Sequence, residues 1–148
     1  MPETKLTCTR RIQFCAGHRL LNHEGKCAHL HGHNYVALIE AEADALDEVG
    51  RVIDFSVLKE RVGGWIEVYW DHGFLYNVYD VFVHETIAAA QSAFNQKSYA
   101  MPCNPTAENI ARHLLEEVCP NALVGCGVRV ARVTVWETEN CFAIAEAR

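Results

Sequence analysis

The chain has 148 residues, of which 50% are apolar and 22% are charged, and its formal net charge is −6. This length predicts one domain, residues 1–148, around a single core. No apolar run is long enough to span a membrane, and the first residues lack the apolar region of a secretory signal. A negative net charge also disfavours nonspecific binding to nucleic acid. We therefore expect a cytoplasmic protein with neither membrane nor nucleic-acid partners.

The order of apolar and polar residues predicts an α+β domain. Alternation predicts strands at residues 5–15, 34–43, 128–138 and 141–147, with the first two and the last two pairing as hairpins. Helical spacing predicts helices at 55–69 and 84–97 and a third helix that Thr106 caps, followed by a loop at 119–127. The predicted architecture is an antiparallel sheet with helices on one face.

A histidine-rich stretch, CAHLHGH (residues 27–33), lies in the connection of the first hairpin. His31 and His33 are two residues apart, so both side chains point to the same side of an extended chain. His18 follows the first strand, at the same end of the hairpin. Catalytic zinc usually has three protein ligands and one open position, and these three histidines are the predicted set. Each one alone could equally be a solvated loop residue, and His29 is a rival ligand.

Two further features indicate proton transfer. Cys27 lies four residues before His31, and a thiolate near a cation or a histidine can act as a base or nucleophile. The alternative is a small buried apolar side chain, one of seven scattered cysteines expected to be free thiols. Asp71 and His72 are adjacent in WDHGF, and a carboxylate that orients an imidazole makes a proton relay. Such adjacent pairs also arise by chance.

Three residues in the last third of the chain are candidates for binding a ligand. Glu137, in VWETEN, follows apolar residues, where a carboxylate is costly unless it receives hydrogen bonds. It would suit a ligand with two adjacent N–H donors, although an exposed turn glutamate is the simpler reading. Thr106 and Glu108, in NPTAEN, could serve only as a cap and a first-turn acid of a helix.

Six stretches resemble, in chain order, the motifs of the 6-pyruvoyl-tetrahydropterin synthase and 6-carboxytetrahydropterin synthase family: FCAGH, CAHLHGHNY, VIDFSVLK, WDHGFL, NPTAEN and VWETEN. The resemblance covers nearly the whole chain. It implies a tunnelling fold, with a four-stranded antiparallel sheet and helices on one face. Sheets of neighbouring subunits would join into a barrel of trimers, stacked as a homohexamer, which would also cover the exposed sheet edges.

The resemblance implies a role for each candidate residue. Zn²⁺ would be held by His18, His31 and His33. Cys27 would be the proton-abstracting thiolate, with Asp71 and His72 as a relay at a subunit interface. Glu137 would anchor the amino-pyrimidine edge of a pterin, with Thr106 and Glu108 lining the pocket.

The implied substrate is 7,8-dihydroneopterin triphosphate. The C-x-x-x-H-G-H spacing is similar to that of the bacterial carboxy branch, which forms 6-carboxy-5,6,7,8-tetrahydropterin and releases acetaldehyde and triphosphate on the route to queuosine. The alternatives are the pyruvoyl branch or a related pterin-acting enzyme, and a non-catalytic, zinc-stabilised pterin-binding protein with a closed four-ligand site. The segment around residues 78–103 and Gly73 depart from the family pattern, which leaves room for a different substrate preference.

Overall fold

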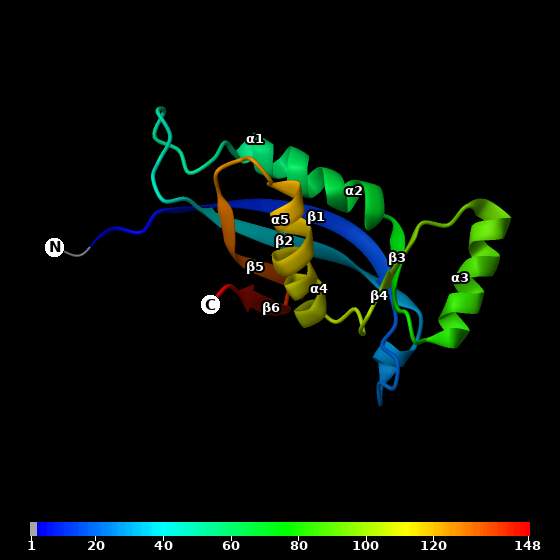
Figure 1. Cartoon of the computed structure of the whole chain (residues 1–148). Coiled ribbons are helices and arrows are strands. Elements are labelled where there is room, and N and C mark those ends of the chain that lie inside the picture. Colours follow the sequence, from blue (N-terminus) through cyan, green and yellow to red (C-terminus); the bar gives the residue numbers. More distant parts are fainter. Residues whose placement is uncertain (1–2) are drawn as a thin grey trace.

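The computed structural model describes residues 3–148 and contains one six-stranded sheet, and the helices that form the main core lie on one of its faces (Figure 1). The strand order is β4-β3-β1-β2-β5-β6. The strands are β1 (Thr7–His18), β2 (His31–Glu42), β3 (Gly73–Asn77), β4 (Ser98–Met101), β5 (Arg129–Thr138) and β6 (Cys141–Glu146). The predicted α+β fold class is confirmed.

The prediction of four strands is correct for the antiparallel part of the sheet but misses two others. β1, β2, β5 and β6 pair antiparallel, whereas β3 and β4 extend the sheet beyond β1 as parallel strands. Both are short, and β3 is largely buried on both faces, so neither shows the alternation that marks a half-exposed strand. Parallel neighbours need a crossover connection, and helix α3 (Val81–Phe94) provides it between β3 and β4.

The first hairpin is longer at its loop end than the pattern predicted. β1 continues to His18 and β2 already begins at His31, and these two residues are directly opposite each other. The H-G-H sequence therefore lies inside a strand and not in the connection. Cross-strand hydrogen bonds extend the strands through Gly17 and Gly32, although glycine weakens the local signal for a strand.

The predicted helix at 55–69 is present as α1 (Phe55–Leu58), a π-helical turn and α2 (Gly64–Tyr69). Helix α3 was predicted three residues too late. The Asp80 side chain caps its start by accepting from Val83 N–H, and Asn95, with a left-handed φ of 58°, ends it.

The third predicted helix comprises α4 (Ala107–His113), a second π-helical turn and α5 (Cys119–Ala122). The expected loop at 119–127 is therefore helical at its start. Pro120 lies in the first turn of α5, where its missing N–H is tolerated.

The core lies between one face of the sheet and helices α1, α2, α4 and α5. Helix α3 packs apart from this core, over β3, through Val83 and Ile87 against Tyr76 (Figure 1). The opposite face of the antiparallel strands has no helix on it and carries partly exposed apolar side chains: Val36, Leu38, Trp136, Phe142 and Ile144. None of the helices in residues 3–148 has the length and hydropathy needed to cross a bilayer.

Candidate metal centre and active site

Three histidines meet where the first hairpin ends. His18 and His31 are cross-strand partners, and His33 is two residues further along β2, so all three side chains are on the helix-covered face. Their ring centroids lie 4.5–5.1 Å apart, and the Nε2 atoms of His18 and His31 are separated by 3.0 Å. In residues 3–148, these three form one of two side-chain groups whose donor atoms all lie within 4.8 Å of one another.

The hydrogen bonds of two rings to backbone carbonyls place a proton on their outer nitrogens. His18 Nδ1 lies 2.8 Å from the Pro105 carbonyl oxygen, and His31 Nδ1 lies 2.7 Å from the His29 carbonyl oxygen. A carbonyl only accepts, so each Nδ1 donates, and the neutral ring keeps a lone pair on Nε2. Burial lowers the pKa of His18 to about 4, so this ring is neutral at pH 7. When both rings are neutral, two lone pairs face each other, an arrangement that a cation between them would stabilise.

The third histidine also fits a metal ligand. His33 Nε2 is buried without a hydrogen-bond partner, and the nearest acidic oxygen is Glu137 Oε1, 3.4 Å away. Burial lowers the pKa of His33, while the Glu137 carboxylate acts in the opposite direction. A buried nitrogen left unpaired is costly, and a bound ion would satisfy it. The three imidazole nitrogens therefore suit a divalent transition-metal ion.

The Cys27 thiol lies in the connection between β1 and β2 and outside the ligand group. Cys27 is in a short 3-10 turn, Lys26–Ala28, and its carbonyl oxygen accepts from Leu20 N–H at 2.8 Å. Burial raises the pKa of Tyr35, next to the histidines in β2, and the charges of Glu137 and Cys27 raise it further. His29 is exposed and contributes only its carbonyl oxygen. Neither Cys27 nor His29 is close enough to belong to the histidine group.

The Asp71–His72 pair is not with the histidines in this chain. It forms the turn between α2 and β3, where Asp71 Oδ2 accepts from His72 Nδ1 at 2.8 Å. Partial burial raises the pKa of Asp71, but hydrogen bonds from Cys15 N–H and His72 outweigh this and lower it. The residue that the turn meets is Cys15, which sequence reasoning did not select. It lies within FCAGH, but 56 residues from the pair in sequence, and only the fold brings them together.

A lysine that follows helix α3 in the chain holds this turn through two hydrogen bonds. Lys97 Nζ donates to the carbonyl oxygens of Glu67 and Asp71 at 2.8 and 2.7 Å, at the end of α2. Gly73 follows the pair, and a Cβ there would come within 2.9 Å of the Trp70 carbonyl oxygen. The glycine at this position is therefore a consequence of the tight turn.

The remaining predicted residues divide between the metal centre and a helix start. Glu137, at an irregular point of the β5–β6 pairing, faces His33 and lines a groove of about 760 Å³ with Val36, Leu38 and Trp136. Thr106 caps α4 by accepting from Asn109 N–H at 3.1 Å, directly after the Pro105 that binds His18. Glu108 is exposed in the first turn of α4.

The fold and the histidine cluster define a tunnelling-fold protein with a candidate metal centre. The model of the 6-pyruvoyl tetrahydropterin synthase family matches residues 7–148. A relative from Rickettsia felis, named 6-carboxy-5,6,7,8-tetrahydropterin synthase, is 42% identical over 137 residues, which cover 93% of this chain and 97% of the relative. The chain belongs to the 6-pyruvoyl tetrahydropterin synthase family. Because the alignment covers nearly all of both chains, the segment around 78–103 does not set this chain apart from that relative.

Solved structures agree on the fold. An uncharacterized protein from Wolinella succinogenes has a TM-score of 0.84 at 21% identity, covering 99% of this chain and 100% of that chain. The 6-pyruvoyl tetrahydropterin synthase of Caenorhabditis elegans has a TM-score of 0.67 at 23% identity, covering 98% of this chain and 97% of that chain. At these identities the likeness supports the tunnelling fold and nothing finer.

Proposed function

We propose that this protein is a zinc-dependent lyase that converts 7,8-dihydroneopterin triphosphate into 6-carboxy-5,6,7,8-tetrahydropterin, acetaldehyde and triphosphate. The observation that carries the proposal is the three-histidine cluster, in which the Nε2 atoms of His18 and His31 lie 3.0 Å apart, with the half-buried Cys27 in the connection between these two residues. The carboxy product is favoured over the pyruvoyl one because the R. felis relative bears the carboxy name at 42% identity.

His18, His31 and His33 would hold Zn²⁺, which neutral imidazoles bind well. The bound ion would supply Lewis acidity towards the side-chain hydroxyl oxygens of the pterin. The chain's own work is to keep each imidazole in the correct tautomer, through the carbonyl oxygens of Pro105 and His29. Three protein ligands leave a position free for substrate, whereas a non-catalytic zinc site would need a fourth. Within residues 3–148, no fourth side chain joins this group.

Cys27 would remove a proton from the substrate side chain as a thiolate. Its place in the connection that joins His18 to His31 supports this role. Asp71 would orient His72 through the 2.8 Å hydrogen bond to Nδ1, which leaves Nε2 free to take or give a proton. Since this pair is not with the histidines of its own chain, it would serve the centre of a neighbouring subunit.

We infer a homohexamer, a dimer of trimers, in which the uncovered sheet face lines a barrel. Phe142 and Ile144 are about half exposed on this face, at 51% and 48%, and an apolar surface of this kind favours association. The outer strands β4 and β6 also leave unpaired backbone groups, which neighbouring subunits would bind.

Mixing inactive subunits tests whether two chains share a site. Cys27→Ala and His72→Asn subunits, each inactive alone, are expected to regain part of the activity when co-assembled, because one interface then has an intact thiol and an intact relay. Asparagine is chosen because it tolerates the left-handed φ of 61° at His72. As the control, a mixture of Asp71→Asn subunits with His72→Asn subunits should stay inactive, since both substitutions damage the same relay. Failure of the first mixture to recover activity would contradict the shared site.

Glu137 would anchor the pterin ring by accepting two N–H donors from its amino-pyrimidine edge. The adjoining groove, with Trp136 and Val36 on its walls, suits a flat ring system. Thr106 and Glu108, at the start of α4, would line the other side of the pocket. The position of Glu137, 3.4 Å from His33, would bring the ring next to the metal.

Glu137→Gln is expected to weaken pterin binding by about 1.5–3 kcal/mol, the usual worth of hydrogen bonds to a charged group. This corresponds to a roughly ten- to hundred-fold loss of affinity. Isothermal titration with an unreactive pterin measures it, and zinc content should not change. Glu139→Gln is the matched control, since this neighbouring glutamate also lines the groove but is exposed. If the Glu137→Gln variant bound the pterin normally, the anchor would lie elsewhere, with Glu108 as the next candidate.

The proposed function as a whole is tested by metal removal. Protein treated with a chelator should lose the ability to consume 7,8-dihydroneopterin triphosphate, and added Zn²⁺ should restore it. Unchanged turnover by metal-free protein would refute zinc dependence. Full zinc occupancy without any turnover would favour a non-catalytic pterin-binding protein.

A further inference from the structure

The side chain of Asn104 holds the connection between β1 and β2, residues 19–30, against the rest of the chain. Its Oδ1 accepts from Leu21 N–H at 2.9 Å, and its Nδ2 donates to the Leu21 carbonyl oxygen at 2.9 Å. A backbone N–H only donates and a carbonyl oxygen only accepts, so these two bonds fix which way the amide faces. Asn104 thus binds both backbone polar groups of a residue 83 positions away in sequence.

Asn104 is itself held in place from two elements. Its carbonyl oxygen accepts from Thr106 N–H at 2.8 Å and from the Asn109 side chain at 2.9 Å, at the start of α4. Asn77, the last residue of β3, donates from Nδ2 to Asn104 Oδ1 at 3.2 Å. Because both the backbone and the amide of Asn104 are fixed, it can set the position of the segment that it binds.

The contacts of Asn104 and its neighbour join the two parts of the proposed site. Pro105 holds the imidazole of His18 through its carbonyl oxygen, 2.8 Å from Nδ1. Leu20, which precedes the residue that Asn104 binds, donates its N–H to the Cys27 carbonyl oxygen at 2.8 Å. Two successive residues of the chain therefore hold the candidate metal ligand and the connection that carries the thiol.

We propose that Asn104 is a positioning residue, which fixes the connection that carries Cys27 relative to the metal ligand His18. The proposal rests on the proposed function in one respect, the role of Cys27 as the base. Asn104 lies outside the histidine group, and its replacement leaves the carbonyl oxygen of Pro105 in the chain. The metal should then stay bound while the thiol loses its fixed position.

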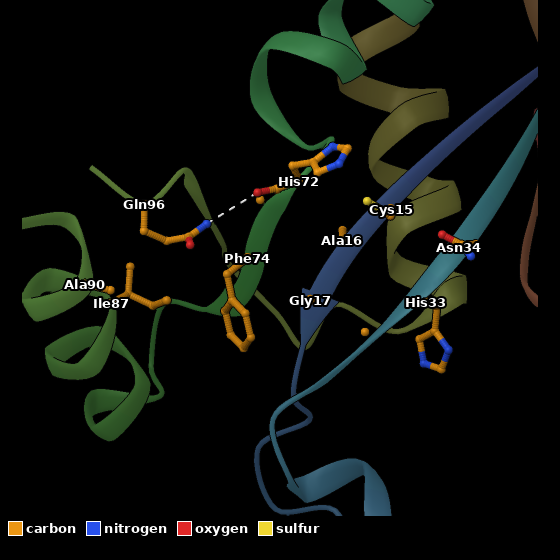
Figure 2. A pocket seen from close by; sticks show the side chains of 12 residues that line it. Cys15, Ala16, Gly17, His33, Asn34, His72, Phe74, Ile87, Ala90 and Gln96 are labelled. Atoms are coloured by element: carbon orange, nitrogen blue, oxygen red, sulfur yellow. Dashed lines mark hydrogen bonds between the residues drawn. The ribbon is translucent and has the colours of Figure 1, made fainter. Parts of the chain in front are cut away.

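Helix α3 supplies an internal reference, because it borders a different pocket. Figure 2 shows this pocket, of about 520 Å³, with Phe74 from β3 and Ile87 and Ala90 from α3 on its walls. Neither Asn104 nor Leu21 lines it. The replacement of Asn104 should therefore leave this part of α3 unchanged.

Hydrogen exchange of the zinc-loaded protein measures the contact without any turnover. In Asn104→Ala, the protected amides of residues 19–30 are expected to exchange roughly tenfold faster, the factor that corresponds to one lost hydrogen bond. The amides of residues 85–94, in α3, should exchange as before. Asn104→Asp should have the same effect, since it keeps an acceptor for Leu21 N–H but presents an oxygen, not a donor, to the Leu21 carbonyl oxygen.

Turnover shows whether Asn104 acts through the thiol. Asn104→Ala should lower kcat by about ten- to hundred-fold, as expected for a displaced catalytic group, with KM and zinc content unchanged. In a Cys27→Ala background, the same substitution should lower kcat no further, because the group that it displaces is already absent. A general weakening of the structure would slow both backgrounds alike.

Asn121→Ala is the matched control. The Asn121 side chain also donates to a backbone carbonyl oxygen, that of Glu117 at 2.8 Å, but in α5. This variant should keep the exchange of residues 19–30 and the turnover unchanged. Thermal melting identifies folded variants, and either Asn104 variant suffices.

Three results would each overturn the proposal: unchanged exchange at residues 19–30 in a folded Asn104 variant, loss of zinc from it, or a further fall of kcat in the Cys27→Ala background. Full turnover by Cys27→Ala alone would instead refute the role of Cys27 in the proposed function. The exchange of residues 19–30 would still decide whether Asn104 fixes the connection.

Discussion

Replacing both His31 and His33 by alanine is expected to remove the bound metal and abolish turnover. The two substitutions take away two of the three nitrogens that converge at the loop end of the first hairpin. A single remaining imidazole, His18, cannot hold an ion against water and buffer at the affinity of a three-ligand site. The protein should still fold, because both side chains are only half-buried and the strands are held by backbone pairing.

Metal analysis after dialysis measures this effect. The wild-type protein should retain about one zinc per chain, and the double variant should retain almost none. His29→Ala is the control, since this exposed histidine contributes only a backbone carbonyl that alanine keeps. Full zinc occupancy in the double variant would show that the ion binds elsewhere and would end the assignment of the centre.

The second large effect is expected when Cys27 is replaced. Cys27→Ala should lower turnover by roughly 10²–10⁴-fold, the range over which a positioned acid or base contributes, while zinc stays bound. The physical reason is that Cys27 lies in the connection that joins His18 to His31 without being part of the ligand group. Steady-state kinetics and metal analysis on the same preparation give both quantities.

Cys141→Ala is the matched control, because this exposed cysteine at the start of β6 belongs to neither side-chain group. It should leave both turnover and zinc content unchanged. If Cys27→Ala released the metal, Cys27 would be a fourth ligand, and a closed, non-catalytic zinc site would replace the proposed enzyme. Undiminished turnover would move the base to another residue.

Much of the fold could be predicted from the sequence because apolar residues recur at regular spacings in several of its strands and helices. The hairpin of β1 and β2 and the helix at 55–69 bury one face each, so their apolar residues recur at spacings of two and of three to four. β3 and β4 could not be predicted in this way. Gly73–Asn77 is mostly buried, and Ser98–Met101 has four residues, too few to show a period.

The histidine centre could be anticipated because its members are close in sequence and at one hairpin end. Nothing in the sequence near His18 indicated that Pro105, from the start of α4, would fix its tautomer. Likewise, Cys15 and Asp71 come together only because the turn after α2 meets the edge of β1. Contacts between residues far apart in the chain depend on packing, which local patterns do not encode.

Product analysis tests the central claim most directly. Zinc-loaded wild-type protein is incubated with 7,8-dihydroneopterin triphosphate, and mass spectrometry identifies and counts the products over time. The account predicts 6-carboxy-5,6,7,8-tetrahydropterin with acetaldehyde and triphosphate in equal amounts. A pterin that keeps its full side chain as the pyruvoyl product, with triphosphate but no acetaldehyde, would contradict it, as would the absence of any product.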